Sequence, residues 1–109
     1  MDIKQVRDEL DKGMRQFLYL EEGPDGAGWS LRYAVGTRNH TLVEQGMRSV
    51  GAHFHGGKGP EQYKPNEITN YWDDTQAAFR CFYIDRFLGF VDDLDMNELA
   101  KKLKEFGIK

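Results

Sequence analysis

Charged residues separate three apolar side chains near the N-terminus that recur at helical spacing, namely Ile3, Val6 and Leu10. Asp2 precedes them and belongs to the residue types that cap helix N-termini, while Gly13 follows and is typical of helix ends. The pattern therefore predicts a short amphipathic helix over Asp2–Lys12, whose apolar stripe packs on the rest of the protein.

Two segments after this helix have strand patterns. Phe17–Glu22 and Trp29–Val35 are separated by Gly23–Gly28, where proline and glycine favour tight turns. We expect the two segments to form a β-hairpin with one buried face. The second strand alternates strictly, and its larger apolar residues are expected to face the core, with Ser30, Arg32 and Ala34 opposite; they are Trp29, Leu31, Tyr33 and Val35.

The middle of the chain is rich in turn residues. After the strand ends at Gly36-Thr37, either Asn39 or Thr41 is expected to cap one or two helical turns that end near Gly46. The following segment holds four glycines and Pro60, and we read Gly46–Lys64 as a long loop that is the most mobile part of the molecule. Ser49–Phe54 is a candidate short strand within it.

The last third of the chain predicts two strands and a helix. Glu67–Trp72 and Ala78–Leu88 are strand candidates joined by the turn Asp73–Ala77. Asp95 and Glu98 have the spacing of a helix capping box. Three apolar residues and a terminal glycine then predict a closing helix, namely Leu99, Leu103, Phe106 and Gly107.

These elements predict a mainly β protein, with a small barrel of about five strands between short terminal helices. A length of 109 residues suits a single domain, 1–109, in which the barrel covers about 14–91 and a helical extension covers 92–109. We expect the core to contain Phe17 or Leu18, together with Trp29, Leu31, Tyr33, Val35, Ile68, Phe82, Ile84 and Leu88.

Composition and charge narrow the setting of the protein. The formal net charge is −3, which gives no overall attraction for nucleic acid, although Ala27–Glu67 carries five Lys and Arg against three Glu, or 5 − 3 = +2. Cys81 is the only cysteine, so no internal disulfide can form. Because the sequence also contains no run of about 18 apolar residues, we expect a cytoplasmic protein without membrane association.

The order and spacing of several motifs resemble one family, the WYL-like proteins with an Sm-like, SH3-type β-barrel from Bacteroides, related bacteria, their phages and mobile elements. The similar segments are the charged helix Val6–Gly13, Arg32 and Ala34 on a strand, Gly36–Asn39 followed by Leu42-Val43, Pro65, Ile68–Asp73, and Phe79–Phe82 leading to Asp85, Leu88 and Val91. Phe79 stands where the family commonly has Trp. The resemblance implies a barrel but carries no defined biochemical activity.

Basic residues are the first candidates for a binding site. Arg32, Arg38, Arg48 and Lys58 could form one phosphate-binding surface with Lys64 if the long loop folds back over the second strand. Scattered solvated charges are the simpler interpretation.

Arg80 lies between aromatic residues, where a guanidinium can contact a phosphate or stack on a base. A structural role is the alternative that we favour for it. The Arg80 stem would then pack on the barrel and its head would pair with Asp73, Asp74 or Asp85.

Other chemistries have weak support in the sequence. His53 and His55 lie two apart and could reach one metal, but a structural metal site needs more ligands. Gly56–Gly59 lacks P-loop spacing, and the adjacent pairs Asp73-Asp74 and Asp92-Asp93 suit turns better than acid–base catalysis. We therefore expect no enzyme activity and no cofactor.

Two functions remain. The first is a non-enzymatic binding module for nucleic acid or a phosphate-bearing ligand, suggested by the local positive charge with its interleaved aromatic residues. The second is a phage- or mobile-element-encoded accessory protein that binds and modulates a host protein, suggested by the negative net charge. The sequence contains no indication of the oligomeric state.

Overall fold

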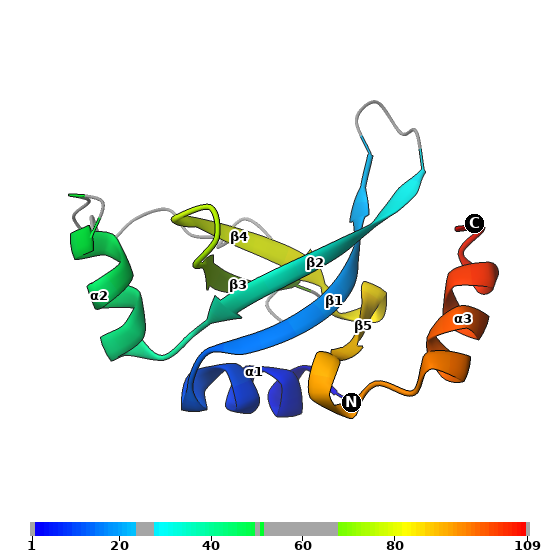
Figure 1. Cartoon of the computed structure of the whole chain (residues 1–109), viewed down its shortest axis with the longest axis horizontal. Helices are drawn as coiled ribbons and strands as arrows, with labels where there is room; N and C mark the ends of the chain where they lie inside the picture. Colours follow the sequence, from blue (N-terminus) through cyan, green and yellow to red (C-terminus); the bar gives the residue numbers. More distant parts are fainter. Residues whose placement is uncertain (1, 24–27, 50, 52–67, 109) are drawn as a thin grey trace.

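The computed structural model describes residues 2–23, 28–49, 51 and 68–108. Within these ranges the chain forms five strands and three α-helices, with short 3-10 turns beside the last strand (Figure 1). The elements in order are α1 (Ile3–Lys12), β1 (Arg15–Glu22), β2 (Trp29–Thr37), α2 (His40–Ser49), β3 (Ile68–Asp73), β4 (Ala78–Tyr83), η3 (Ile84–Arg86), β5 (Phe87–Phe90), η4 (Val91–Asp93) and α3 (Met96–Glu105).

The five strands form one antiparallel sheet in the order β4-β3-β2-β1-β5. The β1–β2 hairpin is paired along its whole length, from Arg15 opposite Gly36 to Glu22 opposite Trp29. In contrast, β2 pairs with β3 only at its end, where Gly36 lies opposite Asp73 and Thr37 opposite Trp72. The sequence prediction of a mainly β fold with terminal helices is confirmed.

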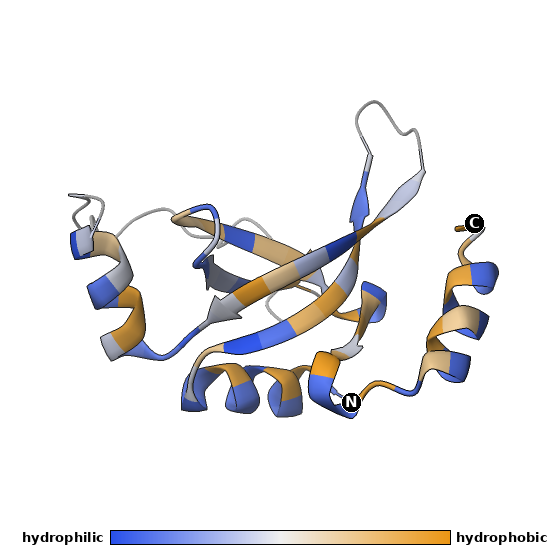
Figure 2. Cartoon of the chain, in the orientation of Figure 1, coloured by the Kyte–Doolittle hydropathy of each residue, from blue (hydrophilic) through white to orange (hydrophobic). Residues whose placement is uncertain are grey.

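Helix α1 packs against the sheet beside β1 (Figure 1). Asp2 caps it by accepting a hydrogen bond from the N–H of Gln5, and the Gln5 side chain accepts one in return from the N–H of Asp2. Hydrophobic and hydrophilic residues alternate around the helix (Figure 2). Val6 and Leu10 are fully buried and contact an aromatic cluster, formed by Phe17, Tyr19, Tyr71, Phe82 and Phe90 with Ala34.

Helix α3 packs on a second, smaller core. Asp95 caps the helix by accepting hydrogen bonds from the N–H groups of Asn97 and Glu98, as the sequence predicted. Leu99 packs with Leu20 and Leu88. The predicted apolar residues Leu103 and Phe106 lie against this cluster, together with Leu18, Trp29 and Ile108.

The prediction of which face of β2 is buried is wrong. Leu31 and Tyr33 are 45% and 52% exposed, while Ala34 is fully buried and Arg32 faces inward. Ala34 lies opposite Phe17 within the aromatic cluster. The large rings of the neighbouring strands already fill this space, so the inner face of β2 carries its small residue there.

The predicted strand Ala78–Leu88 is in fact two strands, and this prediction is also corrected. β4 ends at Tyr83 and pairs with β3 along its whole length. The chain then turns through η3, and β5 pairs with β1 at the opposite edge of the sheet. Ile84, expected in the core, lies in this turn and is only partly buried. Phe17, Ile68, Phe82 and Leu88 are buried as predicted.

Helix α2 is longer than the sequence indicated. Asn39 caps it, since its Oδ1 accepts a hydrogen bond from the N–H of Leu42, but the helix continues to Ser49 instead of ending near Gly46. A Cβ added to Gly46 would lie 2.4 Å from Nε1 of Trp72. The glycine therefore permits close contact between α2 and β3. The predicted loop loses its first residues to α2, and most of the candidate strand Ser49–Phe54 lies outside the described residues.

The buried carboxylate of Asp73 on β3 links this strand to β2 and β4. Asp73 is fully buried, and its Oδ1 accepts hydrogen bonds from the N–H of Thr75 at 3.0 Å, the Thr75 hydroxyl at 2.7 Å and the N–H of Gln76 at 3.2 Å. Its Oδ2 lies 3.0 Å from Nη2 of Arg32 and 3.7 Å from Nε of Arg80. One side chain thus closes the β3–β4 turn and pairs with cations from β2 and β4.

The polar contacts around Asp73 continue into the aromatic core on one side and toward solvent on the other. The hydroxyls of Tyr19 and Tyr71 share a buried hydrogen bond of 2.7 Å. Glu21 approaches both guanidiniums, at 3.6 Å from Arg32 and 3.7 Å from Arg80. Burial alone would raise the pKa of Asp73, but the hydrogen bonds from Thr75, Arg32 and Gln76 outweigh it and hold that pKa below its ordinary value of 3.8.

We predict that Asp73→Asn lowers the free energy of unfolding by about 3 kcal/mol at neutral pH, because two partly buried guanidiniums lose their shared counterion. The Asp73 carboxylate contributes stability above its unfolded pKa of 3.8, and this contribution is lost as pH falls through the lower folded pKa. Urea unfolding across the acid range should therefore show the difference between wild type and Asp73→Asn shrinking with acidity. Asp74→Asn, at an exposed neighbour, is the control. A pH-independent difference would contradict this account.

Candidate functional site

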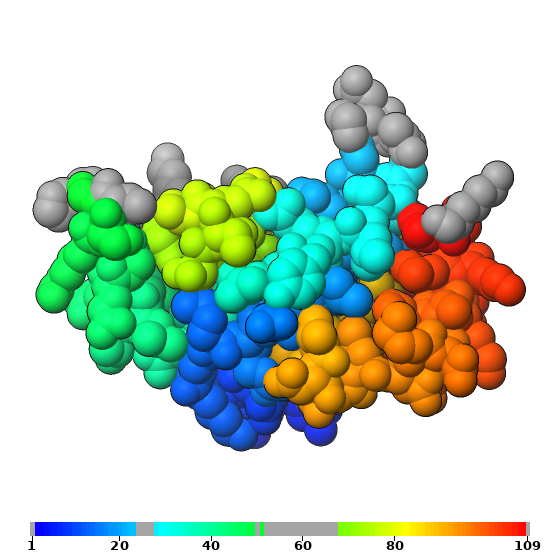
Figure 3. Space-filling model, in the orientation of Figure 1, coloured from blue at the N-terminus to red at the C-terminus, as the bar shows by residue number. Residues whose placement is uncertain are grey.

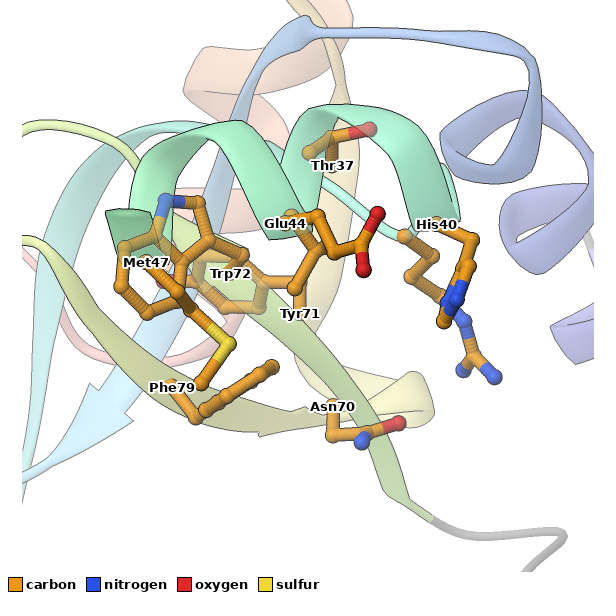
Figure 4. Close-up of a pocket in the computed structure, with 10 residues that line it drawn as sticks. Thr37, His40, Glu44, Met47, Asn70, Tyr71, Trp72 and Phe79 are labelled. Carbon is orange, nitrogen blue, oxygen red and sulfur yellow. The ribbon is translucent and has the colours of Figure 1, made fainter. Parts of the chain in front are cut away.

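A cavity of about 340 Å³ opens between α2 and the β3–β4 pair. Figure 4 shows its walls, which come from the end of β2, one side of α2 and the β3–β4 pair. The residues that line it are Thr37, Arg38, His40, Val43, Glu44, Met47, Asn70, Tyr71, Trp72 and Phe79. This volume lies near the lower end of the range for small-molecule sites in proteins.

Part of the cavity wall is apolar. Trp72 is almost fully buried against α2, and its ring meets that of Phe79 edge-on, with the centroids 5.2 Å apart. Phe79 remains 47% exposed although it is a large aromatic residue. Val43 and Met47, one helical turn apart on α2, extend the apolar wall. An exposed ring beside a cavity can stack against a planar ligand.

Arg38 supplies the positive charge of the cavity. The chain around it is held firmly, because the N–H of Arg38 and the hydroxyl of Thr37 both donate to the carbonyl of Leu10, at 2.9 and 3.1 Å. Its Nε lies 3.4 Å from a carboxylate oxygen of Asp11. Its Nη1 is buried and has no hydrogen-bond partner within the described part of the chain.

The Arg38 guanidinium is incompletely stabilised. Burial lowers the pKa of Arg38, the charge of Arg7 adds to this effect, and the carboxylate of Asp11 only partly opposes it. The Arg38 side chain is 27% exposed, and an anion bound at the exposed part of its guanidinium would supply the missing negative charge. Arg38 is therefore the residue of the cavity best suited to contact an anion.

The other predicted basic residues lie elsewhere. Arg32 and Arg80 come together around Asp73 and Glu21, with side-chain exposures of 16% and 33%. Arg48 lies on α2 with 78% exposure, and its Nη2 is 4.0 Å from a Glu44 oxygen. Lys58, Lys64 and the candidate metal ligands His53 and His55 lie outside the described residues.

Sequence reasoning missed most of the cavity. His40, Glu44, Asn70 and Met47 were not candidates, because the prediction ended α2 near Gly46 and did not place it against β3. One available signal was the pair Val43 and Met47, whose four-residue spacing extends an apolar helical face beyond the first turns.

The described residues contain no group of three or more His, Cys, Asp or Glu that could hold a metal ion. None of the helices in that part of the chain has the length and apolar character needed to cross a membrane.

The contacts of Arg80 favour a structural role, and we predict that Arg80→Ala lowers the free energy of unfolding by roughly 1–3 kcal/mol. The side chain approaches Asp73 and Glu21, and Nη2 donates to the Gln76 side chain. Thermal and urea unfolding would measure the loss. Arg48→Ala, at an exposed arginine, should leave stability within about 0.5 kcal/mol of wild type. A stable Arg80→Ala protein that has lost ligand affinity would instead place a binding surface at Arg80.

Comparison with known proteins agrees with the observed topology. Residues 3–88 match the family model WYL_2, described as having an Sm-like SH3 beta-barrel fold. Neither the search of curated proteins nor that of solved structures gives a match. The matched region begins in α1 and ends in β5, so it includes the whole five-stranded sheet except for its last residues. The chain therefore belongs to the WYL_2 family, with its Sm-like SH3 β-barrel fold.

Proposed function

We propose that this protein is a non-enzymatic binding module that holds a phosphate-bearing ligand, such as a nucleotide of a nucleic acid, in the cavity between α2 and β3–β4. The observation that carries the proposal is that Arg38, whose side chain is 27% exposed and whose Nη1 lacks a hydrogen-bond partner among the described residues, lines the same cavity as an exposed aromatic ring. A Sm-like SH3 barrel domain suits a small binding module in general.

The proposal assigns different roles to the arginines. Arg32 and Arg80 already share carboxylate partners, so an added phosphate would have to displace Asp73 or Glu21 from them. Among the described residues Arg38 approaches one carboxylate, that of Asp11, so it can donate to a phosphate without displacing a shared counterion. Phe79 would then contact a planar group of the same ligand, because both residues line one cavity.

The test uses the two tryptophans of the chain, of which Trp72 lines the cavity and Trp29 lies by α3. We expect titration with nucleoside monophosphates and a short single-stranded oligonucleotide to shift the indole N–H resonance of Trp72 and leave that of Trp29 in place. Arg38→Ala should weaken binding at least about tenfold, the loss expected for a charged hydrogen bond. Binding should also weaken as salt rises.

Arg48→Ala is the matched control, since Arg48 carries the same charge on the exposed side of α2. Its affinity should remain near that of wild type. Equal losses in the two variants would indicate diffuse electrostatic attraction and contradict a site at Arg38. No binding at low salt would reject the phosphate-ligand function altogether.

A specific observation favours a second function, binding of a protein partner. Along β2, the carbonyl of Val35 accepts a hydrogen bond from the N–H of Asp74, so the backbone groups of Tyr33 and Leu31 face the same edge. In the described residues neither has a strand partner on that edge, and both side chains are exposed. Figure 3 shows atoms of β2, in cyan, at the surface beside the yellow-green β3–β4 segment.

This edge suits an extended segment of a partner protein with apolar residues at alternate positions. On β1, the residues opposite Leu31 and Tyr33 are Leu20 and Leu18, which pack in the core formed with α3, so the apolar side chains open to a partner here are Leu31 and Tyr33. A phage- or mobile-element-encoded protein that modulates a host protein could use such a surface.

If the β2 edge is available for pairing, its amides should exchange hydrogen in an alternating pattern. The amides of Leu31 and Tyr33 face the free edge and should exchange faster than those of Arg32 and Ala34, which face β1. Exchange measured residue by residue on the free protein would show this. Equal protection at all four positions would mean that the edge is already covered, and the second function would lose its basis.

A further inference from the structure

A carboxylate lies in the same cavity as the unsatisfied guanidinium. Glu44 extends from α2, and Figure 4 shows its carboxylate reaching over the cavity on the side toward His40. Within the described ranges its nearest cation is Arg48 at 4.0 Å, beyond hydrogen-bond distance, and its own side chain is 54% exposed. A carboxylate repels a phosphate group, so the cavity is poorly suited to inorganic phosphate alone.

The position of Glu44 on α2 gives the cavity a polar edge beside an apolar one. Glu44 lies one turn after His40, while Met47 lies one turn after Val43, and all four line the cavity. Asn70 contributes an amide from the opposite wall, on β3. A ligand seated here meets hydrogen-bonding groups along its edge and apolar surface on its face.

An ionised carboxylate can only accept hydrogen bonds, and it binds best to two adjacent donors. Among the common nucleobases, guanine alone presents two such donors, N1–H and the N2 amino group. Adenine and cytosine place an acceptor nitrogen beside their amino group, and uracil flanks its single N–H with two carbonyl oxygens. One oxygen of a carboxylate therefore meets a lone pair on each of these three bases.

We propose that the cavity selects guanine nucleotides, with Glu44 accepting from N1–H and N2–H of the base while Arg38 contacts the phosphate. The base then lies against the exposed ring of Phe79. This inference rests on the proposed phosphate-ligand function and adds the identity of the base. It also explains why a cationic and an anionic side chain line one cavity.

The test compares GMP with AMP, CMP and UMP on the wild-type protein, by calorimetry and by the Trp72 indole resonance. We expect GMP to bind at least about tenfold more tightly, since a carboxylate hydrogen-bonded to two donors is a strong contact. Inosine monophosphate keeps N1–H and lacks the amino group, so its affinity should be intermediate.

Glu44→Gln should reduce the advantage of GMP severalfold without weakening UMP, because the amide replaces an acceptor with a donor. Glu105→Gln, the same change at an exposed glutamate on α3, should keep the preference, and thermal unfolding should show that both variants are folded. Equal binding of all four nucleotides by wild type, or an undiminished GMP preference in Glu44→Gln, would overturn the guanine assignment while the phosphate-ligand function stands. If wild type binds none of the four, the proposed function itself fails.

Discussion

The buried carboxylate of Asp73 is the interaction on which the arrangement of the strands depends. It closes the β3–β4 turn through Thr75 and Gln76, and it neutralises cations that arrive from two other strands. Without it, Arg32 and Arg80 would place two positive charges at the end of an aromatic core with only Glu21 between them. Such burial is costly, so the carboxylate determines which residues can face inward at this end.

This constraint explains the orientation of β2. Arg32 must point inward to reach Asp73, and alternation along the strand then directs Leu31 and Tyr33 outward. A rule that places the more apolar face inside gives the opposite orientation. The alternation of β2 could be predicted from the sequence, but its direction could not, because the acceptor that holds Arg32 lies on another strand, forty-one positions later.

Local chemistry was the most predictable part of the fold. Caps at Asp2, Asn39 and Asp95 depend on hydrogen bonds to residues two or three positions away, and the sequence displays them directly. Errors arose where distant contacts decide the outcome. Gly46 resembles a helix end but lies inside α2, where Trp72 occupies the space of a side chain. The cavity was missed for the same reason, because its walls meet only through that contact.

The arginines show why counting charge could not locate a binding site. Arg32, Arg38 and Arg80 each have a buried guanidinium nitrogen without a hydrogen-bond partner among the described residues. Arg32 and Arg80, however, share two carboxylates, while Arg38 approaches only that of Asp11 and lines a cavity. The difference lies in the carboxylates that surround each guanidinium and not in the charge of the arginine itself. A cation that two carboxylates already neutralise stabilises the fold, whereas one held rigidly beside a cavity with a single carboxylate neighbour gains free energy when an anion arrives. Because Thr37 and Leu10 fix the backbone at Arg38, that gain is not offset by the ordering of a mobile segment.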